Sequence, residues 1–226
     1  MYPLTERPGE YVLPHLLEKA LHTATNDVPE DHPLPFEYLG PDDVGTCLHD
    51  VLTELVERDV SESTLRSRGD VVREVFDETL YDIVPDVDDT ERQALFRFFD
   101  QEVLDDFVAS DLWNLIQDAE AVTVEKSVDG LSTVGDVELE IHGAADFVVE
   151  TGDGDRHVAE VKISLTPFTV KTRRPYEIQV STYAYLFEQQ QTAARRVRRS
   201  VETFGAERET ITSSWPPSII ERRLSR

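Results

Sequence analysis

Two acidic residues and a lysine lie close together around one predicted β-hairpin in the middle of the chain. Asp146 is on the first predicted strand, Glu160 and Lys162 are on the second, and a turn-forming Thr-Gly-Asp-Gly-Asp segment at residues 151–155 joins them. A turn centred on Asp153 puts Asp146 opposite Glu160, with their Cβ atoms about 4.5–5.5 Å apart. The sequence therefore predicts two neighbouring carboxylates with an amine beside them.

This arrangement suits a divalent cation next to a phosphate. Side chains alternate along a strand, so Phe147 and Val161 point to a core face, while Asp146, Glu160 and Lys162 share the opposite face. Two adjacent carboxylates repel each other unless one takes a proton or a cation lies between them. Oxygen ligands favour Mg²⁺ or Mn²⁺, which also bind substrate phosphate, and a nearby ammonium can orient water or neutralise charge on the phosphoryl group.

An ordinary solvent-exposed hairpin gives a similar pattern, with one surface ion pair worth at most about 1 kcal/mol. The small residues Gly143 and Ala144 before Asp146 favour the functional interpretation, because they would let a ligand come close to the backbone.

Two predicted helices supply three further polar candidates. His49 lies at the flank of an apolar helical stripe and can reach a neighbouring cleft, although a partly buried histidine with no ligand role explains it equally well. Gln179 and Tyr183 are four residues apart and share one helical face, from which neutral donors could contact a phosphate backbone.

Periodicity and turn signals predict mostly helices up to residue 120 and then strands. The helices are expected near residues 13–23, from Asp42 or Asp43 to about residue 58, over 62–80, over 90–118 with a Thr90-x-x-Gln93 capping box, and over 176–199; the strands are expected near 122–124, 138–150 and 156–165. We expect an N-terminal helical region over residues 1–120 and a catalytic core over 121–226, which together make one compact domain.

Charge is distributed unevenly along the chain. The sequence has 46 acids, 22 bases and a formal net charge of −24, and only four of the bases are lysines. Residues 160–226 nevertheless carry more bases than acids, including Lys171, Arg173 and Arg174 before the last predicted helix and Arg195, Arg196, Arg198 and Arg199 at its end. The acidic, lysine-poor composition indicates a protein adapted to high salt, and the basic final third is where an anionic partner is expected.

Features that the sequence lacks restrict the class of protein further. The single cysteine, Cys47, excludes an intramolecular disulfide and a four-cysteine iron–sulfur cluster within this chain. The sequence has no apolar run long enough to span a membrane and no apolar signal region after Met1, so a cytoplasmic protein is expected.

The ordered set of motifs resembles the PD-(D/E)xK nucleases of the RecB/AddA helicase-nuclease type. The resemblance rests on Gly45-Thr46-Cys47-Leu48-His49, Gly143-x-x-Asp146, Glu160-Val161-Lys162 and Gln179-x-x-x-Tyr183. It implies an α/β (α+β) fold with a restriction-endonuclease-like core, in which a mixed central sheet is flanked by helices. It also implies Mg²⁺ or Mn²⁺ held by His49, Asp146, Glu160 and the Val161 carbonyl, with Asp146, Glu160 and Lys162 catalytic.

The same resemblance implies DNA contacts from Gln179 and Tyr183, which the basic Lys171, Arg173 and Arg174 would supplement, and a possible role for Glu125. Ala145 stands where many members have proline, and no GxxxxGK[ST] loop is present, so the chain has no motor of its own. We expect a DNA nuclease that prefers single strands or ends and acts in repair or recombination, either alone or with a separate helicase. A catalytically silent DNA- or helicase-binding module on the same fold remains the alternative.

Overall fold

The computed structural model describes residues 11–12, 39, 41–134, 137–164, 170–190, 196–205 and 209–212. The helix predicted near residues 13–23 and the basic residues after 212 lie outside these ranges. Within them, no helix is both long enough and apolar enough to cross a membrane.

A helical layer forms from residues that follow the 3.6-residue apolar period. Its elements are α2 (Pro41–Glu57), α3 (Glu62–Ser67), α4 (Asp70–Ile83), α5 (Asp89–Phe98), the π-helical turn η1 (Phe99–Val103), α6 (Leu104–Val108) and α7 (Asp111–Gln117). Helix α2 begins with proline, which suits a first turn because its missing N–H has no partner there in any case. The predicted capping box of α5 is wrong: Asp88, not Thr90, caps it by accepting hydrogen bonds from the N–H groups of Thr90 and Glu91.

The strands are β1 (Tyr11–Val12), β2 (Ala121–Val134), β3 (Val137–Glu150), β4 (Arg156–Ser164), β5 (Val197–Gly205) and β6 (Glu209–Thr212). In the described part of the chain they form one mixed six-stranded sheet in the order β1-β3-β4-β5-β6, with β2 paired to β3. Strands β2, β3 and β4 are antiparallel neighbours, and β4 and β5 are parallel because α8 (Val170–Gln190) crosses over between them. The fold is therefore α+β, as predicted.

The predicted hairpin register is confirmed. The ladder pairs Phe147 with Ala159 and Glu150 with Arg156, which centres the turn on Asp153. Gly154 closes this turn with a left-handed φ of 81°, a conformation that glycine adopts without the penalty of a Cβ.

The predicted last helix is wrong at both ends. Helix α8 starts at Val170, runs through the buried Pro175 and ends at Gln190, whereas Val197–Gly205 form strand β5. The missing N–H of Pro175 costs one helical hydrogen bond, and burial of the helix against the sheet outweighs it. The β-branched Val197 and Val201 suit the strand, which is central and pairs with both β4 and β6.

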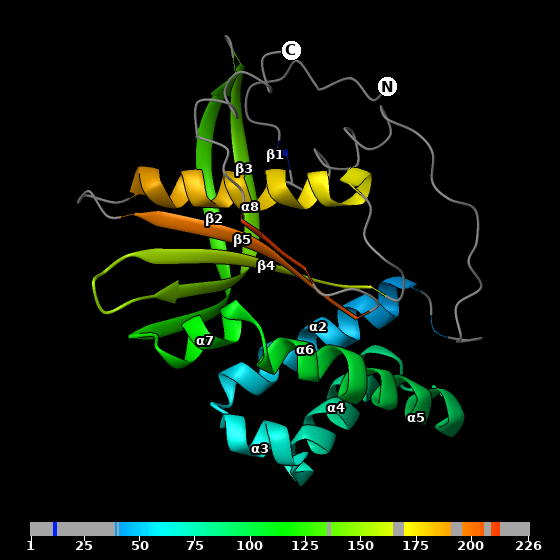
Figure 1. The fold of residues 1–226 in the computed structure, drawn as a ribbon. Helices are drawn as coiled ribbons and strands as arrows, with labels where there is room; N and C mark the ends of the chain where they lie inside the picture. The colour runs from blue at the N-terminus through cyan, green and yellow to red at the C-terminus, as the bar shows by residue number, and fades with distance from the viewer. Residues whose placement is uncertain are drawn as a thin grey trace.

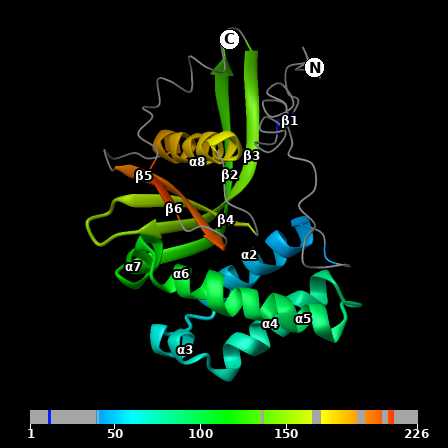
Figure 2. The same ribbon diagram turned by 45° about the vertical axis from the view of Figure 1, so that its right-hand side comes forward.

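Two hydrophobic cores lie on opposite sides of the sheet (Figures 1 and 2). The helical-side core joins α2 and α4–α7 to one face of β3, β4 and β5, and it includes Leu48, Phe76, Phe107, Phe147 and Phe204. The α8-side core joins α8 to the other face, and it includes Val148, Val158, Val180, Tyr183 and Val201. Since the helical-side core draws on residues from Leu39 to Phe204, the helices and the sheet are packed as one body.

Candidate active site

Strand β3 changes direction at Asp146. Ala145 is buried in the α8-side core and Phe147 in the helical-side core, although regular alternation would place both on one face. Strand β2 is distorted at the same place, because Glu125, at the gap in its pairing opposite Asp146, has a left-handed φ of 46°. Such a conformation costs about 1–3 kcal/mol in a residue with a side chain. The bend places Asp146 where the two cores meet, and we call this boundary the seam.

The Asp146 carboxylate connects three elements. Its Oδ2 atom accepts a hydrogen bond of 2.7 Å from the Val161 N–H, just beyond the last ladder pair of β3 and β4. Its Oδ1 atom lies 3.3 Å from Nε2 of His49 on α2. Burial opposes ionisation of Asp146, but His49, Lys162 and the Val161 N–H outweigh it and lower the pKa of this carboxyl below its usual range.

His49 reaches the seam from α2, at the edge of the stripe formed by Leu48, Leu52 and Leu55. Its Nδ1 atom lies 3.2 Å from Oδ1 of Asp50, the next residue in the helix. Burial alone would lower the pKa of His49, but the carboxylates of Asp146 and Asp50 raise it to about 10. The metal-free protein therefore holds an imidazolium between two carboxylates.

Glu160 and Lys162 form the second charged pair. The Lys162 Nζ atom lies 2.6 Å from Oε1 of Glu160, and it also lies 5.1 Å from the centre of the Tyr176 ring on α8. The Glu160 side chain is only 1% exposed, and this burial raises its pKa to about 7 despite the attraction of Lys162. Burial opposes the charge on Lys162, but Glu160 and Asp146 outweigh it and raise the pKa of the ammonium above its usual range.

The donor atoms of this site suit a divalent cation. Within the described part of the chain, Oε2 of Glu160 is buried without a hydrogen-bond partner. Buried polar atoms are normally satisfied, so an unpaired acceptor beside a second carboxylate is suited to binding a cation. Carboxylate oxygens are hard donors that favour Mg²⁺ or Mn²⁺, and an imidazole must lose its proton before it can ligate. The predicted fourth donor, the Val161 carbonyl, stays a prediction.

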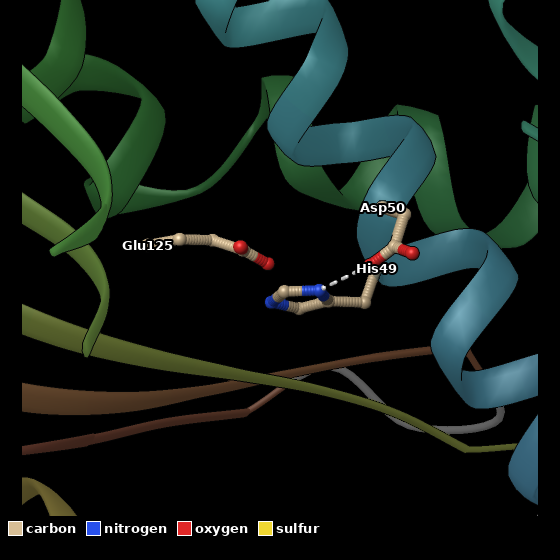
Figure 3. A group of neighbouring side chains, drawn as sticks. All are labelled: His49, Asp50 and Glu125. Carbon is tan, nitrogen blue, oxygen red and sulfur yellow. Dashed lines mark hydrogen bonds and ion pairs between the residues drawn. The ribbon is translucent and has the colours of Figure 1, made fainter. Parts of the chain in front are cut away.

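A second group of donors meets at the His49 side chain. Ligand atoms of His49, Asp50 and Glu125 all lie within 4.8 Å of one another. Figure 3 shows the Glu125 carboxylate pointing toward the imidazole from β2, while Asp50 approaches it from α2. Asp50 and Glu125 also line an acidic cavity of about 370 Å³ that extends along α2 and α4. Glu125 thus lies close to His49, and the role that the resemblance implies for it stays a prediction. Asp50 was missed, although its position next to His49 in the sequence was the signal.

Gln179 and Tyr183 lie inside the interface between α8 and the sheet. The Gln179 side-chain amide donates a hydrogen bond of 3.3 Å to the Tyr183 hydroxyl, and Tyr183 is only 2% exposed. Burial raises the pKa of Tyr183 to about 12, and the charge of Glu160 adds to this effect. The space over Gly143, interpreted from the sequence as room for a ligand, is filled by the Tyr183 side chain.

The basic residues are not arranged as the sequence suggested. Lys171, Arg173 and Arg174 lie within the first turns of α8 rather than before it, and Arg174 is exposed. Arg198 and Arg199 lie on β5 and not at the end of a helix, where the sequence placed them; Arg195 is outside the described ranges. The nitrogen Nη2 of Arg198 lies 3.7 Å from Asp155 in the β3–β4 turn.

One comparison with known proteins assigns the chain to a family. The family model of the PD-(D/E)XK nuclease superfamily matches residues 13–214. One similar solved structure is described as "Crystal structure of SSO0001", with 15% identity, a TM-score of 0.34, and coverage of 92% of this chain and 81% of that one. No curated protein matches the chain. The family match covers most of the chain and contains the whole seam, and it agrees with a mixed sheet flanked by helices. This chain therefore belongs to the PD-(D/E)XK nuclease superfamily and has its restriction-endonuclease-like α+β fold.

Proposed function

We propose that this protein is a Mg²⁺- or Mn²⁺-dependent deoxyribonuclease with Asp146, Glu160 and Lys162 as its catalytic residues. The observation that carries the proposal is the buried Glu160 carboxylate, whose Oε2 atom has no hydrogen-bond partner in the described residues. Its other oxygen contacts the Lys162 ammonium, and Asp146 and His49 meet beside it. A buried, unpaired carboxylate is costly, so its presence beside a lysine is better explained by chemistry than by stability.

The residues have distinct roles in this proposal. His49, Asp146, Glu160 and the Val161 carbonyl hold the cation, which when bound lowers the pKa of water and polarises a phosphoryl oxygen. The hydrogen bond from the Val161 N–H fixes the direction of the Asp146 carboxylate. Lys162 supplies a fixed positive charge toward the scissile phosphate, and its position between Glu160 and the Tyr176 ring keeps it from turning away.

The substrate side of the proposal rests on helix α8. Gln179, which is half-buried, and Tyr183 offer neutral donors next to the site, and Lys171, Arg173 and Arg174 in the first turns of α8 would attract the DNA backbone. Tyr183 is buried, so Gln179 is the better placed of the two to meet a DNA strand.

The net charge of −24 argues for weak intrinsic DNA affinity. Affinity that depends on counterion release falls steeply with salt, so in concentrated salt arginine–phosphate contacts contribute little. We therefore propose that metal–phosphate coordination and base stacking dominate DNA binding. We also propose that the protein acts in repair or recombination in the cytoplasm, on single strands or DNA ends, with a separate helicase as partner.

The test is cleavage of end-labelled single- and double-stranded DNA in high KCl, with Mg²⁺, Mn²⁺ or EDTA. We expect cleavage only with a cation, a loss of about 10²–10³-fold in kcat for Lys162→Ala, and a comparable loss for Asp146→Ala. Lys126→Ala is the matched control, because Lys126 is exposed on β2 and contacts none of the catalytic residues in the described structure.

Calorimetry with Mn²⁺ separates the two roles. Lys162→Ala should still bind Mn²⁺, whereas Asp146→Ala should not. Equal cutting by the wild type and both variants would overturn the site assignment. A wild type that binds DNA and cuts neither substrate would support the catalytically silent module instead.

A further inference from the structure

Helix α8 rests on two glycines of the β2–β3 arm. A Cβ atom at Gly130 would lie 2.6 Å from Cδ2 of Leu186. A Cβ atom at Gly143 would overlap the hydroxyl oxygen of Tyr183 and lie 2.9 Å from two of its ring carbons, Cε1 and Cζ. Both positions exclude a side chain, but the neighbours differ: a leucine tip can rotate away, whereas a buried phenol ring is rigid and has to move as a whole.

The ring that occupies the space over Gly143 belongs to the site. Tyr183 lies over β3 at a point only three residues before Asp146, and the charges of Glu160 and Asp146 act on its hydroxyl. The hydroxyl accepts a hydrogen bond from Gln179, so its own proton is not used in that bond. The oxygen is thus fixed from one side by β3 and from another by Gln179.

We propose that Gly143 is a positioning residue of the active site: by lacking a side chain, it lets the Tyr183 phenol lie directly against β3, three residues before Asp146, and so fixes the position of the hydroxyl. The inference rests on the nuclease function proposed above. It explains a motif residue that metal binding leaves unexplained, since Gly143 offers no ligand and Tyr183 fills the space beside it. This position must therefore leave room for the phenol ring, and even the methyl group of an alanine would occupy that room.

The experiment compares three glycine variants for cleavage, Mn²⁺ affinity and thermal midpoint in high KCl. Gly143→Ala should lower kcat by about 100-fold, because displacements of about 1 Å in a site have effects of that size. Its Mn²⁺ affinity should remain that of the wild type, since no ligand is changed. Gly130→Ala, close-packed under the same helix, should keep its kcat, and so should Gly152→Ala, whose Cβ would meet nothing within 4 Å.

Rescue distinguishes positioning from a general loss of packing. Adding Tyr183→Leu to Gly143→Ala removes the overlap, so the thermal midpoint should rise above that of Gly143→Ala alone while kcat stays low. Tyr183→Phe alone, which keeps the ring, should lower kcat with little change in the midpoint.

Different failures have different meanings. If the wild type cuts no DNA, the nuclease function fails and the active-site role of Gly143 fails with it. If the wild type cuts and Gly143→Ala cuts equally well, only the positioning role is overturned. A loss of kcat in Gly130→Ala as large as in Gly143→Ala would assign the effect to docking of α8 and would also overturn the proposal.

Discussion

The two cores of this protein differ in size and in what their polar neighbours do. The helical-side core is the larger, and two of the polar groups buried beside it are paired: His157 Nε2 lies 2.8 Å from Ser200 Oγ, and the Ser110 hydroxyl donates to the Phe107 carbonyl. The α8-side core is smaller and lies beside the buried, incompletely paired Glu160. The helical side therefore supplies most of the apolar packing, while the α8 side holds the buried charged pair of Glu160 and Lys162.

The seam explains how both sides contribute to one site. His49 comes from α2 on the helical side, Tyr176 from α8 on the other side, and Asp146 lies at the bend of β3 between them. Figures 1 and 2 show α2 and α8 on opposite sides of β4. The close-packed helical-side core makes the sheet rigid. A rigid sheet can hold the neighbouring carboxylates of Asp146 and Glu160 in place although they repel each other.

Removing a large side chain from the helical-side core should have the largest effect on stability. Phe107 is fully buried and contacts the rings of Trp113 and Phe204, at 5.3 and 5.7 Å between centroids. Phe107→Ala should lower the free energy of unfolding by about 3–5 kcal/mol, from lost burial and the remaining cavity. Chemical unfolding in high KCl measures the change. A loss below about 1 kcal/mol would contradict the assigned role of this core.

The next test asks whether the helical side excludes charge. His157 shares the face of Ala159 and Val161, and burial lowers its pKa to about 4. In the unfolded chain the pKa of this histidine is near 6.5, so between about pH 6.5 and 4 the unfolded chain binds a proton that the folded protein does not bind. His157 should therefore cost no stability above about pH 6.5, and its contribution should lower the free energy of unfolding as the pH drops toward 4, by about 3 kcal/mol in total.

The matched variant for this test is His157→Gln, which keeps a polar group for Ser200 and cannot become charged. Its stability should fall less steeply than that of the wild type between pH 6.5 and 4. Parallel curves of stability against pH for the two proteins would show that His157 is protonated in the folded protein without cost. The proposal that the helical side of the sheet excludes charge would then be wrong.

The sequence predicted the hairpin that carries the site better than the elements around it. The turn at residues 151–155 and strict alternation were enough to predict the pairing of Phe147 with Ala159, because both depend on neighbouring residues alone. The change from helix to strand before Val197 was not predictable in this way. Strand β5 forms because β4 and β6 pair with it, and a run rich in arginine carries no local sign of those partners.

The burial of the site was equally hidden. Asp146, Glu160 and Lys162 form a pattern that a solvent-exposed hairpin also shows. The burial of Glu160 depends on tertiary packing, in which α8 lies over this part of the sheet. The bend at Asp146 depends on the left-handed Glu125 of another strand, and glutamate at such a position gives no signal in the sequence. Gly143 was recognised as small, but its neighbour, Tyr183, lies 40 residues away along the chain, and only the fold shows that the two are in contact.

The smallest expected effect concerns how the seam orients His49. A metal-ligating imidazole usually donates its other N–H to a carboxylate, and such partners typically change metal affinity by about 10–100-fold. Asp50 meets this description, with its Oδ1 atom 3.2 Å from Nδ1, which leaves Nε2 to face Asp146. Asp50→Ala should therefore weaken Mn²⁺ binding by a factor in that range, while Asp50→Asn, which keeps an acceptor oxygen, should lose less. Calorimetry measures both.

Glu125 decides whether Asp50 orients the histidine or binds a cation itself. Asp50, Glu125 and His49 could together hold a second ion, because their ligand atoms all lie within 4.8 Å of one another. If Asp50 only orients His49, Glu125→Gln leaves Mn²⁺ affinity and the stoichiometry of one ion unchanged. If the three are ligands, the wild type binds a second ion that both Asp50→Asn and Glu125→Gln remove. In that case the metal site would extend from the seam into the acidic cavity beside α2 and α4. The helical side of the sheet would then take part in metal binding as well as in stability.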